Sequence, residues 1–225
     1  MSGRTLAIGD IHGCLPALER LLQTLELEKD DTLVLLGDYV DRGPDTQGVI
    51  DRLLFLQEEC RLYPILGNHD ELILQIVDGE TWKEGYWLSF GGQQTLDSYG
   101  VSSISDIPSE HLKFLRKCLN FCESEYHFFT HGNYIENKPL EKTPPNVLRW
   151  ESLKTRMPGP HISKKVAVLG HSAQKETQDV LYTGYLICLD TYCYGNGVLT
   201  AFDVHTGEYW QTDKLGKNTV KKRLR

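Results

Sequence analysis

The chain has 225 residues, 40% of them hydrophobic, and a formal net charge of −7 at pH 7. This length and apolar content suit one globular domain, which we place at residues 1–213, followed by a basic tail at 214–225. The acidic balance argues against a nucleic-acid partner, and no apolar run approaches the ~20 residues that a membrane span needs.

Features outside the motifs predict a cytoplasmic protein. The chain starts with no signal-peptide pattern, so secretion is not expected. Its last twelve residues carry six basic and no acidic side chains, which predicts a solvated, frayed terminus, with weak electrostatic tethering as the lesser alternative. The cysteines form no Cys-x-x-Cys pair and are expected to be reduced thiols. They are Cys14, Cys60, Cys118, Cys122, Cys188 and Cys193.

Short apolar segments alternate with amphipathic ones at the start of the chain. Strands are expected at 6–9, 32–36 and 63–66, and leucines at helical spacing between Leu15 and Leu25 mark the first of two intervening helices. Such a βαβαβ unit predicts parallel strands covered by helices.

The rest of the chain adds strands in a less regular order. Strands are expected at 126–130 and 166–169, separated by a proline-containing stretch that is too long for a simple connector and indicates a functional loop. Segments 185–189, 197–204 and 208–212 have the pattern of an antiparallel set. The whole predicts an α/β fold, one domain with a mixed, layered sheet core.

Each of five expected strands runs into a polar residue flanked by glycine. The exits read GDIHG at 9–13, GDYVDRG at 37–43, GNHD at 67–70, THG at 130–132 and GH at 170–171. Because ligand sites in α/β sheets lie beyond the carboxyl ends of strands, these exits should gather at one edge. The residues expected there are Asp10, His12, Asp38, Asn68, His131 and His171.

This set offers only oxygen and imidazole nitrogen ligands. Such ligands suit borderline-hard divalent metals, so we expect Mn, with Fe or Zn as alternatives. Six protein ligands are too many for one catalytic ion with open positions, and they suit two ions ~3.5–4 Å apart. A single strand-end Asp or His is usually a cap or a satisfied core group, but five such exits in register predict a dinuclear site.

The five exits resemble the motif series of the metallophosphoesterases, in particular the bacterial and bacteriophage-type serine/threonine phosphoprotein phosphatases. The stretches WLSFGGQQTLDSYG and LDTYCYGNGVLTAF also resemble that subfamily and extend the likeness to about residue 202. The resemblance implies a layered β-sandwich flanked by helices, with the metals at one sheet edge. It implies that Asp10 and His12 bind one metal, that Asp38 bridges, and that Asn68, His131 and His171 bind the other.

The chemistry implied is direct attack of a metal-bridging hydroxide on phosphorus, with a proton donor for the leaving oxygen. His69, next to the ligand Asn68, is interpreted as that acid, and the resemblance pairs it with Asp41. Arg42 is expected to grip the phosphate bidentately. Asp70 is expected to cap the following helix.

A second phosphate-binding arginine is expected between the two late histidines. Relatives often carry it just after a tryptophan, but here Arg149 precedes Trp150 and Ser152 stands where that pattern would place arginine. We choose Arg149, with Arg156 in reserve.

Three functions remain open at this point. The first is a phosphatase acting on a phosphorylated protein or peptide, which GDYVDRG and the short chain favour. The second is a symmetrical diadenosine tetraphosphatase, which LGNHD favours. The third, a non-catalytic scaffold, would be expected to have lost a ligand or the acid, and all are present. Because GDYVDRG and the short chain favour the first function, we expect phosphopeptides to be hydrolysed with a higher kcat/KM than diadenosine tetraphosphate. The sequence leaves the oligomeric state open.

Overall fold

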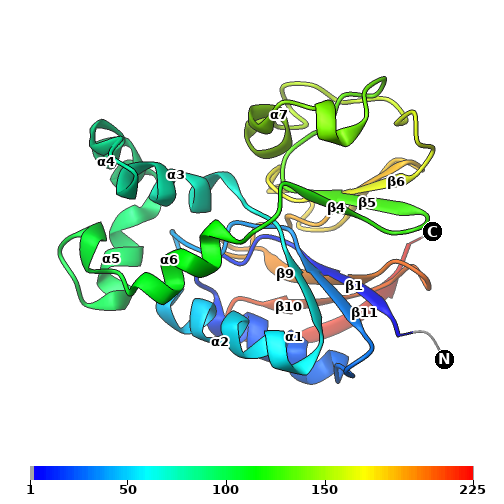
Figure 1. The fold of residues 1–225 in the computed structure, drawn as a ribbon. Coiled ribbons are helices and arrows are strands. Elements are labelled where there is room, and N and C mark those ends of the chain that lie inside the picture. The colour runs from blue at the N-terminus through cyan, green and yellow to red at the C-terminus, as the bar shows by residue number, and fades with distance from the viewer. Residues whose placement is uncertain (1–2, 225) are drawn as a thin grey trace.

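The computed structural model describes residues 3–224, which form two β-sheets packed face to face with helices on the outside (Figure 1). The helices are α1 (Leu15–Leu25), α2 (Thr46–Glu59), α3 (Asn68–Val77), α4 (Glu84–Trp87), α5 (Gln93–Tyr99), α6 (Ser109–Arg116) and α7 (Pro145–Trp150). The strands are β1 (Thr5–Ile8), β2 (Thr32–Leu35), β3 (Arg61–Pro64), β4 (Phe121–Glu123), β5 (His127–Thr130), β6 (Val166–Leu169), β7 (Leu181–Tyr182), β8 (Leu186–Cys188), β9 (Val198–Asp203), β10 (Glu208–Asp213) and β11 (Thr219–Arg223).

The first sheet has six strands in the order β11-β10-β9-β1-β2-β3. Its β1, β2 and β3 are parallel, and α1 and α2 connect them, so the predicted βαβαβ unit is confirmed. In α1, Leu18, Leu21, Leu22 and Leu25 recur on one buried face. That spacing places a single apolar stripe of the helix against the sheet.

The second sheet has five strands in the order β4-β5-β6-β8-β7. A cluster of buried side chains lies between the two sheets and includes Ala7 and Val34 from the first sheet and Phe129, Val168 and Ile187 from the second. A separate core lies between the first sheet and the helices. In Figure 1, α1 and α2 lie on one side of the first sheet, and β4, β5 and β6 lie on the other. The predicted layered sandwich flanked by helices is therefore confirmed.

Two expectations for the C-terminal part are wrong. Segment 185–189 does not join the antiparallel set, because β8 pairs in parallel with β6 in the second sheet, where all three of its residues are buried. Only β9 and β10 form the expected antiparallel pair.

The basic terminus is also not frayed over the residues described, because Thr219–Arg223 form β11 along β10. Lys221 pairs with Glu208 at 2.7 Å and Lys222 with Asp179 at 3.0 Å. Exposed lysines on an edge strand also discourage pairing with a second chain.

Two other expectations concern the chain as a whole. All six cysteines lie within residues 3–224 and none is in a disulfide, as predicted. Across the described residues, no helix combines the length and the apolar character that crossing a membrane would require.

Candidate dinuclear metal centre and active site

The five strand exits meet at one edge of the sandwich. Asp10 and His12 follow β1, Asp38 follows β2, Asn68 begins α3 after β3, and the other two predicted ligands, His131 and His171, follow β5 and β6. Five of the six side chains are buried, and His171 is partly buried. Strands from both sheets therefore deliver the predicted ligand set to a single place.

Asp38 lies at the centre of this set. Its Oδ2 is 3.4 Å from His12 Nε2, and its Oδ1 is 3.4 Å from His131 Nε2. Two groups with metal-ligand spacing share it, one with His12 and His69 and one with His131 and His171. A carboxylate common to two groups is what a bridging ligand between two ions requires.

Each of the three predicted histidine ligands has one ring nitrogen at a backbone carbonyl. His12 Nδ1 is 2.7 Å from Val40 O, His131 Nδ1 is 2.7 Å from Leu36 O, and His171 Nε2 is 3.1 Å from Trp150 O. Donation to these carbonyls fixes the tautomer and leaves the lone pair of the other nitrogen facing the site. This is the outer-shell arrangement usual for metal-binding histidines.

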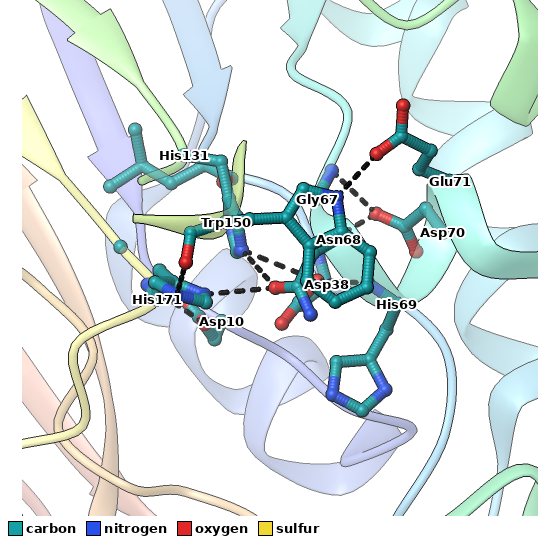
Figure 2. A network of polar contacts seen from close by, with 12 residues as sticks. Asp10, Asp38, Gly67, Asn68, His69, Asp70, Glu71, His131, Trp150 and His171 are labelled. Carbon is teal, nitrogen blue, oxygen red and sulfur yellow. Dashed lines mark hydrogen bonds and ion pairs between the residues drawn. The ribbon is translucent and has the colours of Figure 1, made fainter. Parts of the chain in front are cut away.

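The lone pairs of His131 and His171 then face the same acceptor. His131 Nε2 and His171 Nδ1 both lie 2.9 Å from Asn68 Oδ1, as Figure 2 shows. With these tautomers and with Asn68 Oδ1 facing them, three acceptor atoms converge, as ligands do around a cation. The donor set therefore fits a divalent metal.

Burial has opposite consequences for the two kinds of ligand. It lowers the pKa of His12 and His131, and it lowers the pKa of His171 to about 4, so these imidazoles are neutral at pH 7 and able to bind metal. Burial, then the charges of Asp190 and Asp38, raises the pKa of Asp10. Cations would relieve this repulsion between carboxylates.

The backbone of the site is unusual. Nine non-glycine residues of the described chain have positive φ, and five of these are predicted site residues. They are His12, Asp38, Asp41, Arg42 and His171, with φ between 46° and 69°. Such conformations cost about 1–3 kcal/mol each and concentrate at functional sites. Their clustering supports a functional role for the strand exits.

Asp70 links the GNHD segment after β3 to the GDYVDRG segment after β2. Its carboxylate accepts from Gly67 N at 3.0 Å at the start of α3, so the predicted cap is present. It also accepts from Asp38 N at 2.8 Å and Tyr39 N at 3.0 Å. A Cβ at Gly67 would overlap Asp38 Oδ1, so glycine permits this close approach. Asp70 thus holds the Asp38 loop as well as the helix.

His69 points away from the cluster formed by Asn68, His131 and His171 (Figure 2). Its Nδ1 is 2.7 Å from Asp41 Oδ2. Burial alone would lower the pKa of His69, but Asp38 and Asp41 outweigh it and raise the pKa. These carboxylates therefore shift His69 toward its protonated, donating form relative to a free imidazole.

Two side chains that the sequence did not single out hold Asp41. Trp87 Nε1 donates to both carboxylate oxygens at 3.0 Å, and Thr95 Oγ1 donates to Oδ1 at 2.8 Å. Both lie in WLSFGGQQTLDSYG, the stretch that resembles the phosphoprotein phosphatase subfamily. That resemblance could have pointed to both residues. Its polar members position the Asp41–His69 pair.

Arg42 is partly buried beside the centre. Its Nη1 donates to His12 Nε2 at 3.0 Å, and its guanidinium lies 4.4 Å from the ring centroid of Tyr194. Arg42 helps to line a cavity of about 180 Å³ beside the centre. The polar lining is Arg42, Asn68, His69 and His171, and the apolar lining is Leu72, Tyr86, Phe90 and Trp150.

Arg149 is not among the residues that line this cavity. Its Nη2 donates to Glu71 Oε1 at 2.6 Å, and Glu71 Oε2 accepts from Trp150 Nε1. Arg156, the reserve, pairs with Glu136 and Glu151. Of the proposed phosphate-binding arginines, the described chain therefore brings only Arg42 to the cavity.

Asp190 was missed and lies near the centre. It follows β8 and is buried, and burial raises its pKa to about 6. The sequence shows a sixth apolar strand that ends in a polar residue, at Leu189-Asp190. Asp190 was missed because β8 was expected in the antiparallel set and not beside β6.

Gly91 offers a test of how closely Arg42 must be placed. Arg42 N donates to Gly91 O at 3.0 Å, and a Cβ at Gly91 would lie 2.7 Å from Arg42 Cγ. We expect Gly91→Ala to shift Arg42 and to lower kcat/KM by about 10²-fold, the usual cost of misplacing a catalytic group by ~1 Å. Steady-state kinetics on an aryl phosphate measures this.

Gly79→Ala is the matched control. Gly79 has φ +109° against +108° for Gly91, but its Cβ would meet nothing within 4 Å. Both variants should lose about 1–2 kcal/mol of stability from backbone strain, and Gly91→Ala should lose more because its Cβ also overlaps Arg42. Equal activity of the two variants would show that the contact with Arg42 is unimportant.

Comparison with known proteins identifies the family. A sequence model of the calcineurin-like phosphoesterases matches residues 3–209. The chain belongs to this family. Among curated proteins, this calcineurin-like phosphoesterase is 37% identical over 120 residues to a symmetrical bis(5'-nucleosyl)-tetraphosphatase of Legionella pneumophila (strain Lens), covering 52% of this chain and 39% of that one. It is 45% identical over 73 residues to the Acidovorax sp. (strain JS42) enzyme of the same name, covering 32% and 25%. The matches thus span well under half the length of these relatives.

Solved structures share the fold of this calcineurin-like phosphoesterase at low identity. A chain described as a candidate diadenosine tetraphosphatase superposes with TM-score 0.69 at 23% identity, covering 99% of this chain and 94% of that one. A cold-active protein-tyrosine phosphatase of Shewanella sp. superposes with TM-score 0.72 at 15% identity, covering 100% and 81%. Both likenesses bear on the fold alone.

Proposed function

We propose that the protein is a metal-dependent hydrolase of dinucleoside polyphosphates that cleaves them symmetrically. The observation that carries this proposal is the name shared by the curated relatives, symmetrical bis(5'-nucleosyl)-tetraphosphatase. It favours the alternative reading of the sequence over the phosphoprotein phosphatase that we expected first. The six unpaired thiols support a reducing, cytoplasmic setting.

Six residues would bind the two metal ions. Asp10, His12 and Asp38 would hold one divalent ion, and Asn68, His131 and His171, again with Asp38, would hold the other. Two such ions, Mn by preference and Fe or Zn as alternatives, supply Lewis-acid activation of water and neutralise phosphate charge.

The side chains beside the centre act on the substrate itself. Arg42 lines the cavity and grips the phosphoryl oxygens. His69, held by Asp41, donates a proton to the departing oxygen.

One observation favours phosphoprotein hydrolysis as the second candidate. His69 contacts Asp41, and Trp87 donates to Asp41, so the proposed proton donor is held in place by hydrogen bonds. A serine or threonine alkoxide is a poor leaving group that needs such a donor, whereas a nucleoside diphosphate leaves more easily. A general acid therefore accelerates hydrolysis of a phosphoserine or phosphothreonine more than cleavage of a dinucleoside polyphosphate.

A substrate panel on one Mn²⁺-loaded preparation separates the two candidates. We expect diadenosine tetraphosphate to exceed a phosphothreonine peptide in kcat/KM by more than about tenfold, or roughly 1.4 kcal/mol of transition-state discrimination. ADP should be its only nucleotide product, quantified by chromatography. A tenfold preference for the peptide, or release of ATP and AMP, would reject the proposed function.

A further inference from the structure

The cavity beside the metal centre is small for the proposed substrate. Its volume of about 180 Å³ lies below the ~300–1,000 Å³ usual for pockets that enclose a whole small molecule. A phosphoryl group can enter it, but the rest of a dinucleotide must lie on the rim. The rim side chains therefore decide what else is recognised.

Two aromatic side chains form one wall and extend onto the rim. Tyr86 and Phe90 line the cavity, with ring centroids 4.4 Å apart and planes tilted by 43°. They remain 49% and 42% exposed, so much of each ring faces solvent. The Phe90 ring lies 6.5 Å from the ring of His69, the proposed acid. We call Tyr86 and Phe90 the aromatic ledge.

The aromatic ledge is anchored to the catalytic loop. Trp87, between its two members, is fully buried and donates to Asp41. Gly91, directly after Phe90, accepts from the backbone of Arg42 at 3.0 Å. The ledge is thus fixed relative to the phosphate-binding arginine and to His69. A preorganised surface loses little conformational entropy when a ligand binds to it.

We propose that the aromatic ledge binds a nucleobase of the substrate by stacking, while the adjoining phosphate enters the cavity. This inference rests on the proposed function and assigns its nucleoside specificity. Flat aromatic faces stack on any base, so the ledge would recognise the nucleoside without selecting among bases. With Leu72 and Trp150, the two rings form the apolar part of the cavity lining, beside the polar part that includes Arg42.

A binding comparison tests the ledge without requiring turnover. The probes are α,β-methylene-ADP and the methyl ester of methylenediphosphonate, which carries the same phosphonate chain without a nucleoside. Calorimetry on Mn²⁺-loaded protein should show at least tenfold tighter binding of the nucleotide. The Tyr86→Ala/Phe90→Ala double variant should weaken nucleotide binding by about 5- to 150-fold, the worth of stacking one base, and leave the ester within twofold.

Two matched variants complete the test. Tyr86→Phe keeps both rings and should bind the nucleotide as the wild type does. Trp82→Ala removes an aromatic of the same segment that is 77% exposed and is not among the cavity-lining residues, so it should change neither affinity. Melting temperatures show whether each variant is folded.

Two results would overturn the inference. One is equal affinity of the wild type for both probes, and the other is an equal weakening of both probes in the double variant. Neither depends on which substrate is cleaved. Absence of dinucleotide turnover with intact ledge-dependent nucleotide binding would instead reject the proposed function alone.

Discussion

Replacement of His69 by asparagine is expected to slow hydrolysis of alkyl phosphates by about 10²–10⁴-fold while the metal content stays unchanged. The reason is that His69 Nδ1 contacts Asp41 at 2.7 Å and its ring points away from Asn68, His131 and His171, which supports our assignment of His69 as the acid. That range is the usual contribution of a general acid. Substrates with good leaving groups, including nitrophenyl phosphate and a dinucleoside polyphosphate, should lose less because they need less protonation.

Asp41→Asn should reproduce the same leaving-group dependence more mildly, because the imidazole remains but loses its anionic partner. Steady-state kinetics over a series of leaving groups, with elemental analysis of each variant, makes the measurement. His69 also lies within metal-ligand distance of His12 and Asp38. Loss of one ion from His69→Asn, with an unchanged leaving-group dependence, would make His69 a ligand and refute its assignment as the acid.

Asp38→Asn is expected to abolish turnover, with a fall of at least about 10³-fold on every substrate. Asp38 is the residue common to both ligand groups, so its loss weakens both ions at once. Transition-state stabilisation by bound metal is worth several kcal/mol, and about 4 kcal/mol corresponds to this factor. Activity assays at saturating Mn²⁺ measure the loss.

The same variant has a separate signature in stability. In the wild type, metals should raise the melting temperature, since a ligand that binds only the folded state stabilises it by mass action. In Asp38→Asn this metal-dependent rise should disappear. A full metal-dependent rise in Asp38→Asn would show that Asp38 does not bridge.

The strand exits could be predicted because they depend on local patterns. An apolar run that ends in glycine and a polar residue marks both the end of a strand and a side chain at the sheet edge. Asp10, Asp38 and His131 were therefore placed from the sequence, and the structure brings them together. The parallel order of β1, β2 and β3 followed equally from the alternation of strands and helices.

The features that were missed depend on long-range partners. Arg149 was chosen by its position along the chain, which does not show that its guanidinium pairs with Glu71, 78 residues earlier. Its role in binding phosphate stays a prediction. β8 was assigned to the wrong sheet because a short apolar strand does not specify its partner, and Asp190 was missed with it. The terminus was expected to fray because its charge pattern does not show that Glu208 and Asp179 lie opposite its lysines.

We expect one site, shared through Asp38, to hold two ions that act together. The most direct test is titration of chelator-treated protein with Mn²⁺, following bound metal by elemental analysis and turnover of diadenosine tetraphosphate in the same samples. We expect two ions per chain at saturation, with activity that rises as the second ion binds. Full turnover by protein holding no metal, or maximal turnover with a single ion per chain, would contradict it.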